Sequence, residues 1–147
     1  MTLKYQITED MKNAMRAKDS SRLGAVRLII AAIKQREVDE RTELSDSDVI
    51  SVLEKMLKQR RDSIAAYELA QRSDLADIEK YEVSILQGYL PQQLTDDEIK
   101  NILDQVVIDT GASGIKDMGK VMTVIKPLVA GKADMGKISN LIKSRLV

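Results

Sequence analysis

One pattern of glycine, aspartate and lysine occurs twice near the C-terminus, and it is the feature of the sequence that most suggests chemistry. The first copy (residues 114–126) reads G-I-K-D-M-G-K-V-M-T-V-I-K, and the second copy (residues 131–143) reads G-K-A-D-M-G-K-I-S-N-L-I-K. Both match G-x-x-x-x-G-K, the spacing of a phosphate-binding P-loop. That loop also needs a preceding strand and a Ser or Thr after the lysine, where this sequence has Val121 and Ile138. The pattern therefore does not predict nucleotide hydrolysis.

Two explanations of the repeated residues remain open. Asp117 and Asp134 are predicted helix N-caps, each worth on the order of 1 kcal/mol. Glycine in a first helical turn costs stability unless a ligand or another backbone comes close, and lysine there is mildly unfavourable unless an anion binds. These glycines and lysines are Gly119, Gly136, Lys120 and Lys137. The pattern predicts either a solvated structural repeat or two helix N-termini that hold neighbouring phosphates of a nucleic-acid backbone.

The charge distribution points to an anionic partner for the same end of the chain. The sequence has 23 basic and 23 acidic residues, but from Gly111 onward seven are basic and two are acidic. The local net charge is therefore +5, against −5 for the first 110 residues. Lys126 and Lys143 follow Lys120 and Lys137 by six positions, about 240° around a helix, so the basic residues cannot all face one ligand.

The composition excludes several kinds of site. Without Cys or His, the chain has no disulfide, thiol nucleophile or common zinc site. Carboxylate pairs such as Asp96 and Asp97 could do acid–base work, but adjacent acids at a helix start ordinarily interact with the helix dipole. We expect no catalytic residue, no metal and no cofactor. The apolar runs are too short for a signal peptide or a membrane span, which leads us to expect a cytoplasmic location and no membrane partner.

Apolar periodicity predicts an all-α fold. The first expected helix runs from Leu3 to about Arg16, the second begins at a cap at Asp19 or Ser20, and the third begins at a capping box of Ser45 and Asp48. The fourth runs from a cap at Ser73 to about Gly88, the fifth from Asp96 to about Thr110, and each copy of the repeat contains one further helix. Apolar spacing predicts one stripe in the second helix, Leu23, Val26, Ile29, Ile30 and Ile33, and one in the fourth, Leu75, Ile78, Ile85, Leu86 and Tyr89. The predicted buried faces of the last two helices are Val121, Val124, Ile125 and Leu128, and Ile138, Leu141, Ile142 and Leu146.

A domain boundary is expected near Gln93. Pro91 prevents an uninterrupted helix, and Thr95 with Glu98 forms a capping box for the next one. The sequence therefore predicts an N-terminal helical domain of about four helices over residues 1–92, followed by a C-terminal three-helix bundle over residues 93–147.

Arg27 and one basic cluster of the N-terminal domain are predicted to have structural roles rather than to bind a ligand. Arg27 lies beside an apolar stripe and is predicted to form a partly buried ion pair with Glu79 or Glu82. A basic cluster further along is expected to pair within its own helix rather than to extend a binding surface: Lys58, Arg60 and Arg61, with Glu54 and Asp62.

Several blocks of the sequence resemble a known family. The stretch G-A-S-G-I-K-D-M-G-K-V-M followed by G-K-A-D resembles the C-terminal signature of the GatB/YqeY family. R-L-I-I-A-A-I-K, L-K-Q-R-R-D-S-I and Y-L-P-Q-Q-L resemble its other blocks in the same order, so the resemblance covers the whole chain. It is closest to the free-standing YqeY-type proteins.

The resemblance implies a function in recognition. A related module forms the tail of the B subunit of glutamyl- and aspartyl-tRNA amidotransferase, where it contacts tRNA. The family label of carbon–nitrogen ligase activity with glutamine as amido-N-donor then describes the relatives' complex, since the kinase-like cradle and the glutaminase subunit have no counterpart here. The implied RNA-binding residues are Lys116, Lys120, Lys126, Lys132, Lys137, Lys143 and Arg145, with backbone anion sites at Asp117, Gly119, Asp134 and Gly136.

Three hypotheses follow for function, of which the third, an amidotransferase or a hydrolase, would have only carboxylate pairs such as Asp96 and Asp97 for acid–base work. The first is a non-catalytic accessory that binds tRNA or another structured RNA through basic helix N-termini. The second is a protein-interaction module that docks on an aminoacyl-tRNA synthetase or an amidotransferase subunit through its N-terminal domain.

Overall fold

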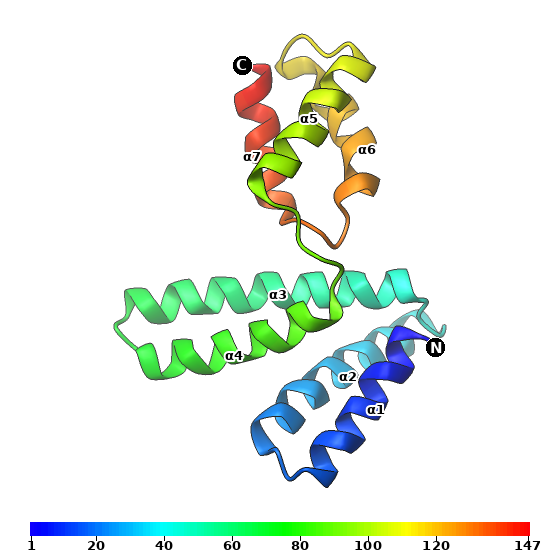
Figure 1. Ribbon diagram of the computed structural model, residues 1–147, viewed down its shortest axis with the longest axis vertical. Coiled ribbons are helices and arrows are strands. Elements are labelled where there is room, and N and C mark those ends of the chain that lie inside the picture. Colours follow the sequence, from blue (N-terminus) through cyan, green and yellow to red (C-terminus); the bar gives the residue numbers. More distant parts are fainter. The chain divides into compact units, whose positions relative to one another are not determined.

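The computed structural model describes residues 1–147 and contains helices only, which confirms the all-α prediction (Figure 1). The helices are α1 (Leu3–Arg16), α2 (Ser20–Glu40), α3 (Asp46–Leu69), α4 (Ser73–Tyr89), α5 (Asp96–Thr110), the 3-10 turn η1 (Ile115–Asp117), α6 (Met118–Val129) and α7 (Met135–Leu146). None of them is long and apolar enough to cross a membrane.

The chain divides into two compact units between Leu90 and Pro91. We call them unit 1 (Met1–Leu90) and unit 2 (Pro91–Val147). Helix α4 ends at Tyr89, and the backbone of Leu90 is extended, as expected for a residue that precedes proline. Each unit has its own apolar core, and each is described separately below.

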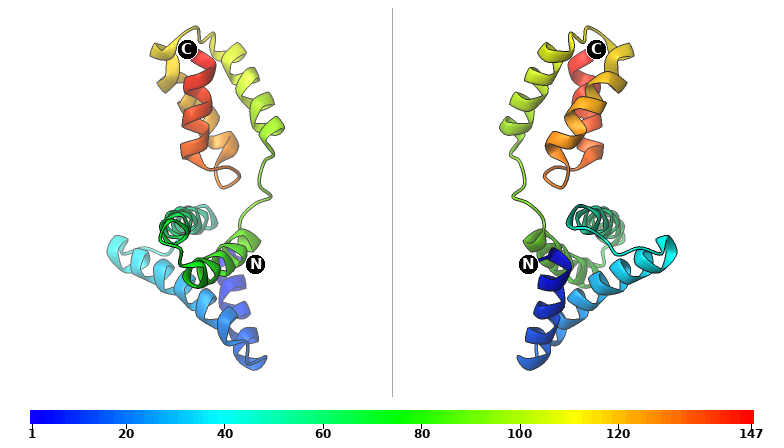
Figure 2. Two further views of the ribbon diagram at one scale, coloured as in Figure 1. Left: turned by 90° about the vertical axis from the view of Figure 1, so that its left-hand side faces the viewer. Right: turned by 90° about the vertical axis from the view of Figure 1, so that its right-hand side faces the viewer.

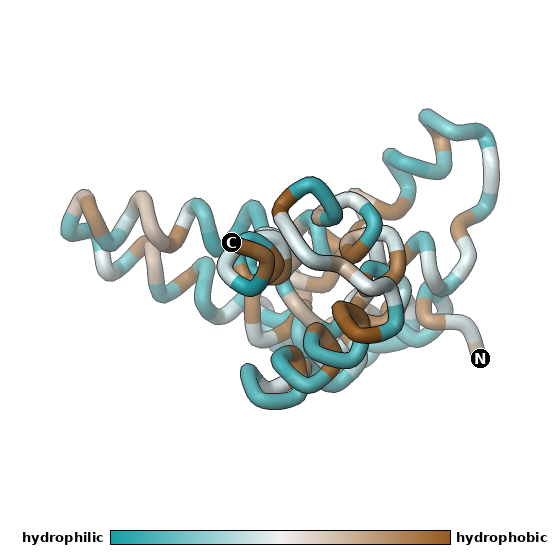
Figure 3. The backbone as a smooth tube through the Cα atoms, turned by 90° about the horizontal axis from the view of Figure 1, so that it is seen from above, coloured by the Kyte–Doolittle hydropathy of each residue, from teal (hydrophilic) through white to brown (hydrophobic).

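Unit 1 consists of two helical hairpins, α1 with α2 and α3 with α4 (Figure 2). Its core includes the stripe of α2 that apolar spacing predicts, with Val26, Ile29 and Ile33 almost fully buried. Hydrophobic and hydrophilic residues alternate along the helices (Figure 3), as expected for helices that bury one face. The α1–α2 hairpin is also fastened to the start of α3 by a hydrogen bond from the Leu3 amide to Asp46 Oδ1, at 2.9 Å.

Most predicted helix starts are confirmed, and two predicted caps are wrong, Ser73 of α4 and Asp117 of α6, the second of which is described below. Asp19 caps α2 by accepting from the Arg22 amide, and Ser45 and Thr95 form the expected capping boxes of α3 and α5. Ser73 does not cap α4. It is the first residue of that helix, and Arg72 stands at the cap position without a side-chain bond to the helix.

The predicted buried stripe of α4 is wrong at Ile78, which is 59% exposed. The residues of this segment that join the core are Ile85, Leu86 and Leu90, all towards its C-terminal end. Ala76, near the start of α4, is also buried, so Ile78 is exposed because no helix of unit 1 covers its side of α4 at that level. Periodicity alone does not show where that cover stops.

The ion pair predicted between α2 and α4 is made by a different arginine. Arg27 is exposed and forms no ion pair, whereas Arg60 of α3 lies with its Nε 3.3 Å from Glu79 Oε2 and 2.5 Å from Glu82 Oε2. All three side chains are at most 20% exposed. The intrahelical pairing expected for Arg60 is therefore also wrong, because its side chain pairs instead with two acids of α4, which packs along α3.

Unit 2 packs α5 and α7 against α6. Val121, Ile125, Ile138 and Ile142 have no exposed surface, as predicted. The predictions for Val124 and Leu128 are wrong, since these residues are 41% and 49% exposed. The buried stripe of α6 is narrow and consists of Val121, Ile125 and Val129, which recur every four residues. Val124 and Leu128 each precede a buried residue by one position, so they lie at the solvent-facing edge of the stripe.

Candidate nucleic-acid interface

The seven candidate RNA-binding cations lie along η1, α6 and α7, and all are exposed. Lys116 is in η1, Lys120 and Lys126 are in α6, Lys132 is in the connection after α6, and Lys137, Lys143 and Arg145 are in α7. Their exposure makes each accessible to an anionic partner. Their neighbours divide them into two groups.

Two of the seven pair with acids of α5. Lys137 Nζ pairs with Asp96 Oδ1, and Arg145 Nε lies 3.3 Å from Asp104 Oδ1. The paired residues are eight positions apart on each helix, so the ion pairs join α5 to α7 at two levels. Both cations are 48% exposed, and such surface pairs are typically worth about 0–1 kcal/mol.

The other five cations have no carboxylate within ion-pair distance. They are Lys116, Lys120, Lys126, Lys132 and Lys143. We call these five residues the unpaired lysines. Their charge is not neutralised locally, so an approaching polyanion experiences it fully, apart from salt screening.

The two helix N-termini of the repeat do not lie together. Helices α6 and α7 run in opposite directions, and the end of α7 returns beside η1 at the start of α6 (Figures 1 and 2). The starts of the two helices are therefore separated by roughly the length of α6, about 18 Å for its 12 residues. The cause is the short connection over residues 130–134, which forces the second helix to fold back. The repeat alone suggested that Lys120 and Lys137 bind neighbouring phosphates. At this separation they cannot.

The two aspartates of the repeat also differ. Asp134 is an N-cap, as predicted, and its Oδ1 accepts from the Gly136 amide at 3.1 Å. Asp117 makes no capping bond to α6. Its Oδ2 instead accepts from the Ser113 amide at 3.0 Å, because η1 precedes α6 without a break and the aspartate closes the loop before that turn.

The protein itself does not require glycine at Gly119 or Gly136. A Cβ atom at Gly119 would meet nothing within 4 Å, and one at Gly136 would meet only the Asp134 carboxylate, at 3.6 Å. Neither residue has a positive φ angle. No neighbouring backbone therefore explains these glycines, and the space at each helix start remains open to a ligand.

Acidic residues of α5 offset the basic repeat within unit 2. Helix α5 has five acidic residues and one lysine, and unit 2 as a whole carries a net charge of only +1. The net charge of +5 counted from Gly111 onward does not include α5, because this helix ends at Thr110. An anionic partner is consequently attracted to surfaces of η1, α6 and α7 that lie away from α5.

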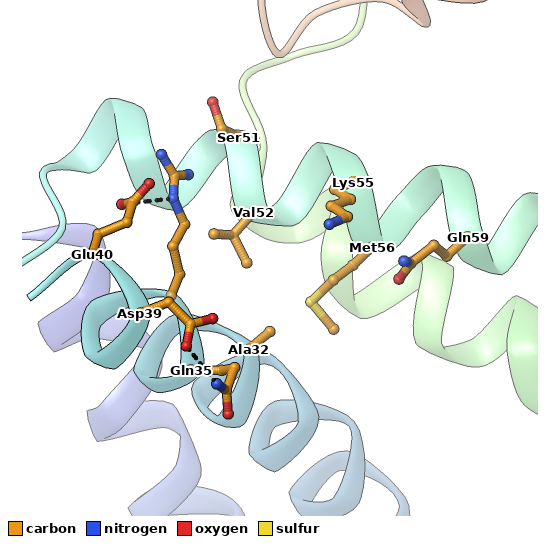
Figure 4. A pocket seen from close by; sticks show the side chains of 10 residues that line it. Ala32, Gln35, Asp39, Glu40, Ser51, Val52, Lys55, Met56 and Gln59 are labelled. Carbon is orange, nitrogen blue, oxygen red and sulfur yellow. Dashed lines mark hydrogen bonds and ion pairs between the residues drawn. The ribbon is translucent and has the colours of Figure 1, made fainter.

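Sequence reasoning missed two grooves. One lies between α5 and α7, holds about 460 Å³, and has the side chains of Leu103 and Leu141 between the two ion pairs. The other, of about 610 Å³, lies between α2 and α3 and combines Ala32, Val52 and Met56 with polar residues at its rim (Figure 4). Each depends on the angle between two helices, for which the sequence contains no local signal. No group of three or more acidic residues is arranged to hold a metal ion.

Comparison with known proteins assigns the family. The family described as Yqey-like protein matches residues 4–146, almost the whole chain. The chain belongs to the YqeY-like family. This result confirms the resemblance seen in the repeat and in the three blocks before it.

The YqeY-like chain is similar to several fungal proteins named "Altered inheritance of mitochondria protein 41, mitochondrial". That of Vanderwaltozyma polyspora is 30% identical over 120 residues, which cover 76% of this chain and 64% of the relative. Those of Pyrenophora tritici-repentis and Meyerozyma guilliermondii are each 31% identical and cover 82% and 85% of this chain, and 70% and 75% of the relatives. The chain thus spans slightly less than two thirds of the first of these relatives.

These names contradict the expected cytoplasmic location, because the relatives are named as mitochondrial proteins. The expectation rested on the absence of a long apolar segment. Mitochondrial targeting segments are amphipathic and arginine-rich rather than apolar, so that criterion does not separate the two compartments.

Proposed function

We propose that this YqeY-like protein is a non-catalytic accessory that binds structured RNA, tRNA in particular, by its phosphate backbone. The observation that carries the proposal is the set of five unpaired lysines on η1, α6, α7 and the connection between α6 and α7. Lysine binds phosphate as a flexible point charge, which suits recognition of a backbone rather than of bases.

The composition of unit 2 favours backbone recognition further. All four tyrosines, the only aromatic residues of the protein, lie in unit 1. Unit 2 therefore has no side chain on which an unpaired base could stack. A folded RNA presents closely spaced phosphates in a fixed shape, and such a surface can be bound by lysines without base contacts.

The acidic helix α5 defines the orientation of binding in this proposal. Lys137 and Arg145 are held by Asp96 and Asp104, so we assign them mainly to the structure of unit 2. Because Lys120 and Lys126 lie about 240° apart around α6, one RNA surface contacts only part of the lysine set. About four phosphate contacts would give a log–log salt slope of about −3 to −4.

The test is a salt titration of unmodified tRNA binding to the full chain. The variant Lys120→Ala with Lys132→Ala removes two unpaired lysines, and we expect it to reduce the magnitude of the slope by about 2. Lys58→Ala with Arg61→Ala removes the same charge from exposed positions of α3 and should leave the slope unchanged. Binding that is insensitive to salt, or equal slopes for both variants, would refute the proposal.

The groove between α2 and α3 favours docking on a protein as a second candidate function. It is large enough for apolar side chains of a partner segment, and Lys55 and Gln59 stand at its rim beside Met56 (Figure 4). The partner proposed is an aminoacyl-tRNA synthetase or an amidotransferase subunit. Co-migration of such a subunit with the full chain on a sizing column, abolished by Lys55→Glu with Gln59→Glu, would support docking. Independent migration of the two proteins would exclude it.

A further inference from the structure

A small polar hollow lies where α1, α2 and α4 meet in unit 1. It holds about 190 Å³, and its walls include Asp10 of α1, Arg22 of α2, and Ser84, Gly88 and Tyr89 of α4. Helix α4 is far in sequence from the α1–α2 hairpin, so the hollow forms only when unit 1 folds. None of them is among the residues proposed to bind RNA.

Opposite charges line this hollow without neutralising each other. Asp10 Oδ2 accepts a hydrogen bond of 2.6 Å from the Tyr89 hydroxyl, and Asp10 and Arg22 do not come within ion-pair distance. Arg22 is half-buried and has no other carboxylate partner. The guanidinium interacts with the Tyr89 hydroxyl, but no carboxylate compensates its charge, so an anionic group of a ligand could pair with it.

Tyr89 lies between the two charges and keeps its proton. Burial raises the pKa of Tyr89, the hydrogen bond to Asp10 raises it further, and Arg22 opposes the shift without reversing it. The hydroxyl is therefore a donor to Asp10 over the physiological range. It fixes one oxygen of the carboxylate and leaves the other for a cationic group.

Gly88 keeps the hollow open at a cost to helix stability. It is the next-to-last residue of α4, has no positive φ angle, and a Cβ atom there would meet nothing within 4 Å. Alanine at a helical position without neighbours is more stable than glycine by roughly 1 kcal/mol. Neither backbone conformation nor crowding requires glycine here, so α4 can accommodate a larger side chain at this position, which lines the hollow.

We propose that this hollow binds a small zwitterion of the size of a free α-amino acid. The carboxylate of the ligand pairs with Arg22, its ammonium group pairs with Asp10, and the position of Gly88 admits the rest of the molecule. A volume of 190 Å³ corresponds to roughly six water molecules at liquid density, which limits the ligand to a few non-hydrogen atoms. This site is independent of the proposed RNA-binding function.

The experiment is a titration of the ¹⁵N-labelled full chain with L-alanine at constant ionic strength, followed by amide chemical shifts. We expect saturable shifts at Asp10, Gly88 and Tyr89. Acetate and methylammonium, which supply only one of the two charges, should bind at least tenfold more weakly, equivalent to about 1.4 kcal/mol. Equal affinity for acetate and L-alanine would overturn the assignment of a zwitterion.

Matched variants test the location of the site. Leucine is a good helix former, so Gly88→Leu should retain the helix while filling the hollow and reducing the affinity for L-alanine at least tenfold. Gly24→Leu is the control, since Gly24 is also helical and open but lies outside the hollow. Arg22→Gln should lower the affinity similarly, with the exposed Arg27→Gln as its control. Wild-type affinity in both Gly88→Leu and Arg22→Gln would refute the proposal.

Discussion

The two copies of the repeat share most of their residues but differ in what those residues do. In the second copy, Asp134 caps its helix and Lys137 is paired with Asp96. In the first copy, Asp117 closes a loop and Lys120 is unpaired. The leading glycines differ too, since Gly131 has a φ angle of 74° and Gly114 is fully extended, with a φ angle of −167°.

The difference teaches which properties of a repeated segment are local. Ile125 and Ile142 occupy matching positions and are both fully buried, because helical period alone places them on the core side. Capping and charge pairing instead depend on what precedes and surrounds each copy. The start of the second copy is held by hydrogen bonds from Gln93 Nε2 to the Gly131 carbonyl and from the Leu94 amide to the Lys132 carbonyl. The first copy has no equivalent support.

The largest effects should come from the shared core positions. Ile125→Ala and Ile142→Ala should each lower the free energy of unfolding of unit 2 by about 2–5 kcal/mol, because each leaves a cavity in a fully packed site. Urea unfolding followed by amide signals of α5, α6 and α7 measures this separately from unit 1. Val124→Ala, at a position 41% exposed, is the control and should cost clearly less. Equal losses for Val124→Ala and Ile125→Ala would contradict the buried face assigned to α6.

The aspartates should separate the two copies by a smaller amount. Asp134→Ala removes a true N-cap and should cost about 1 kcal/mol, whereas Asp117→Ala removes one exposed loop hydrogen bond and should cost less. Asp134→Asn keeps a capping oxygen and should retain most of the stability. The same urea experiment measures all three variants. A larger loss for Asp117→Ala than for Asp134→Ala would show that both copies begin with a cap.

The glycines offer a test in which stability and binding move in opposite directions. Gly119→Ala should stabilise unit 2 by roughly 0.5–1 kcal/mol, because the added methyl group meets no protein atom and the unfolded chain loses freedom. If a phosphate approaches this helix start, the same substitution should weaken tRNA binding. A thermal melt and a tRNA titration of one protein sample measure both effects. Unchanged tRNA affinity in the stabilised variant would remove Gly119 from the proposed interface.

The sequence predicted the parts of the fold that depend on neighbouring residues. Helical period and capping residues located seven helices and most of their starts. It failed at Ile78 and Leu128, where the width of a buried stripe depends on which helices cover it. It also assigned to Arg27 the ion pair that Arg60 makes, since both arginines border apolar stripes and only the path of α4 distinguishes them.

The candidate site was predictable in composition but not in arrangement. Counting charges after Gly111 found the lysines, but the count could not include the acids of α5, which pack beside α7 only after folding. Nor could the repeat reveal that its two helices run in opposite directions. That property depends on the short connection over residues 130–134, and it decides whether Lys120 and Lys137 act together.

The lysines provide the smallest effect on stability and the clearest separation of the two copies. Lys137→Ala should cost unit 2 at most about 1 kcal/mol at low salt, and less in 1 M salt, because its ion pair with Asp96 is exposed and screened. Lys120→Ala should leave stability unchanged or raise it slightly, since that side chain has no partner to lose and a lysine in a first helical turn is mildly unfavourable. For tRNA binding the order should reverse. Lys120→Ala should reduce the magnitude of the salt slope by about 1. Lys137→Ala should reduce it by less, because the Lys137 ammonium group is already paired with a carboxylate and its binding to RNA therefore releases fewer counterions. Equal slopes for the two variants would mean that RNA displaces Asp96, and the two copies would then contribute alike to binding despite their different structures.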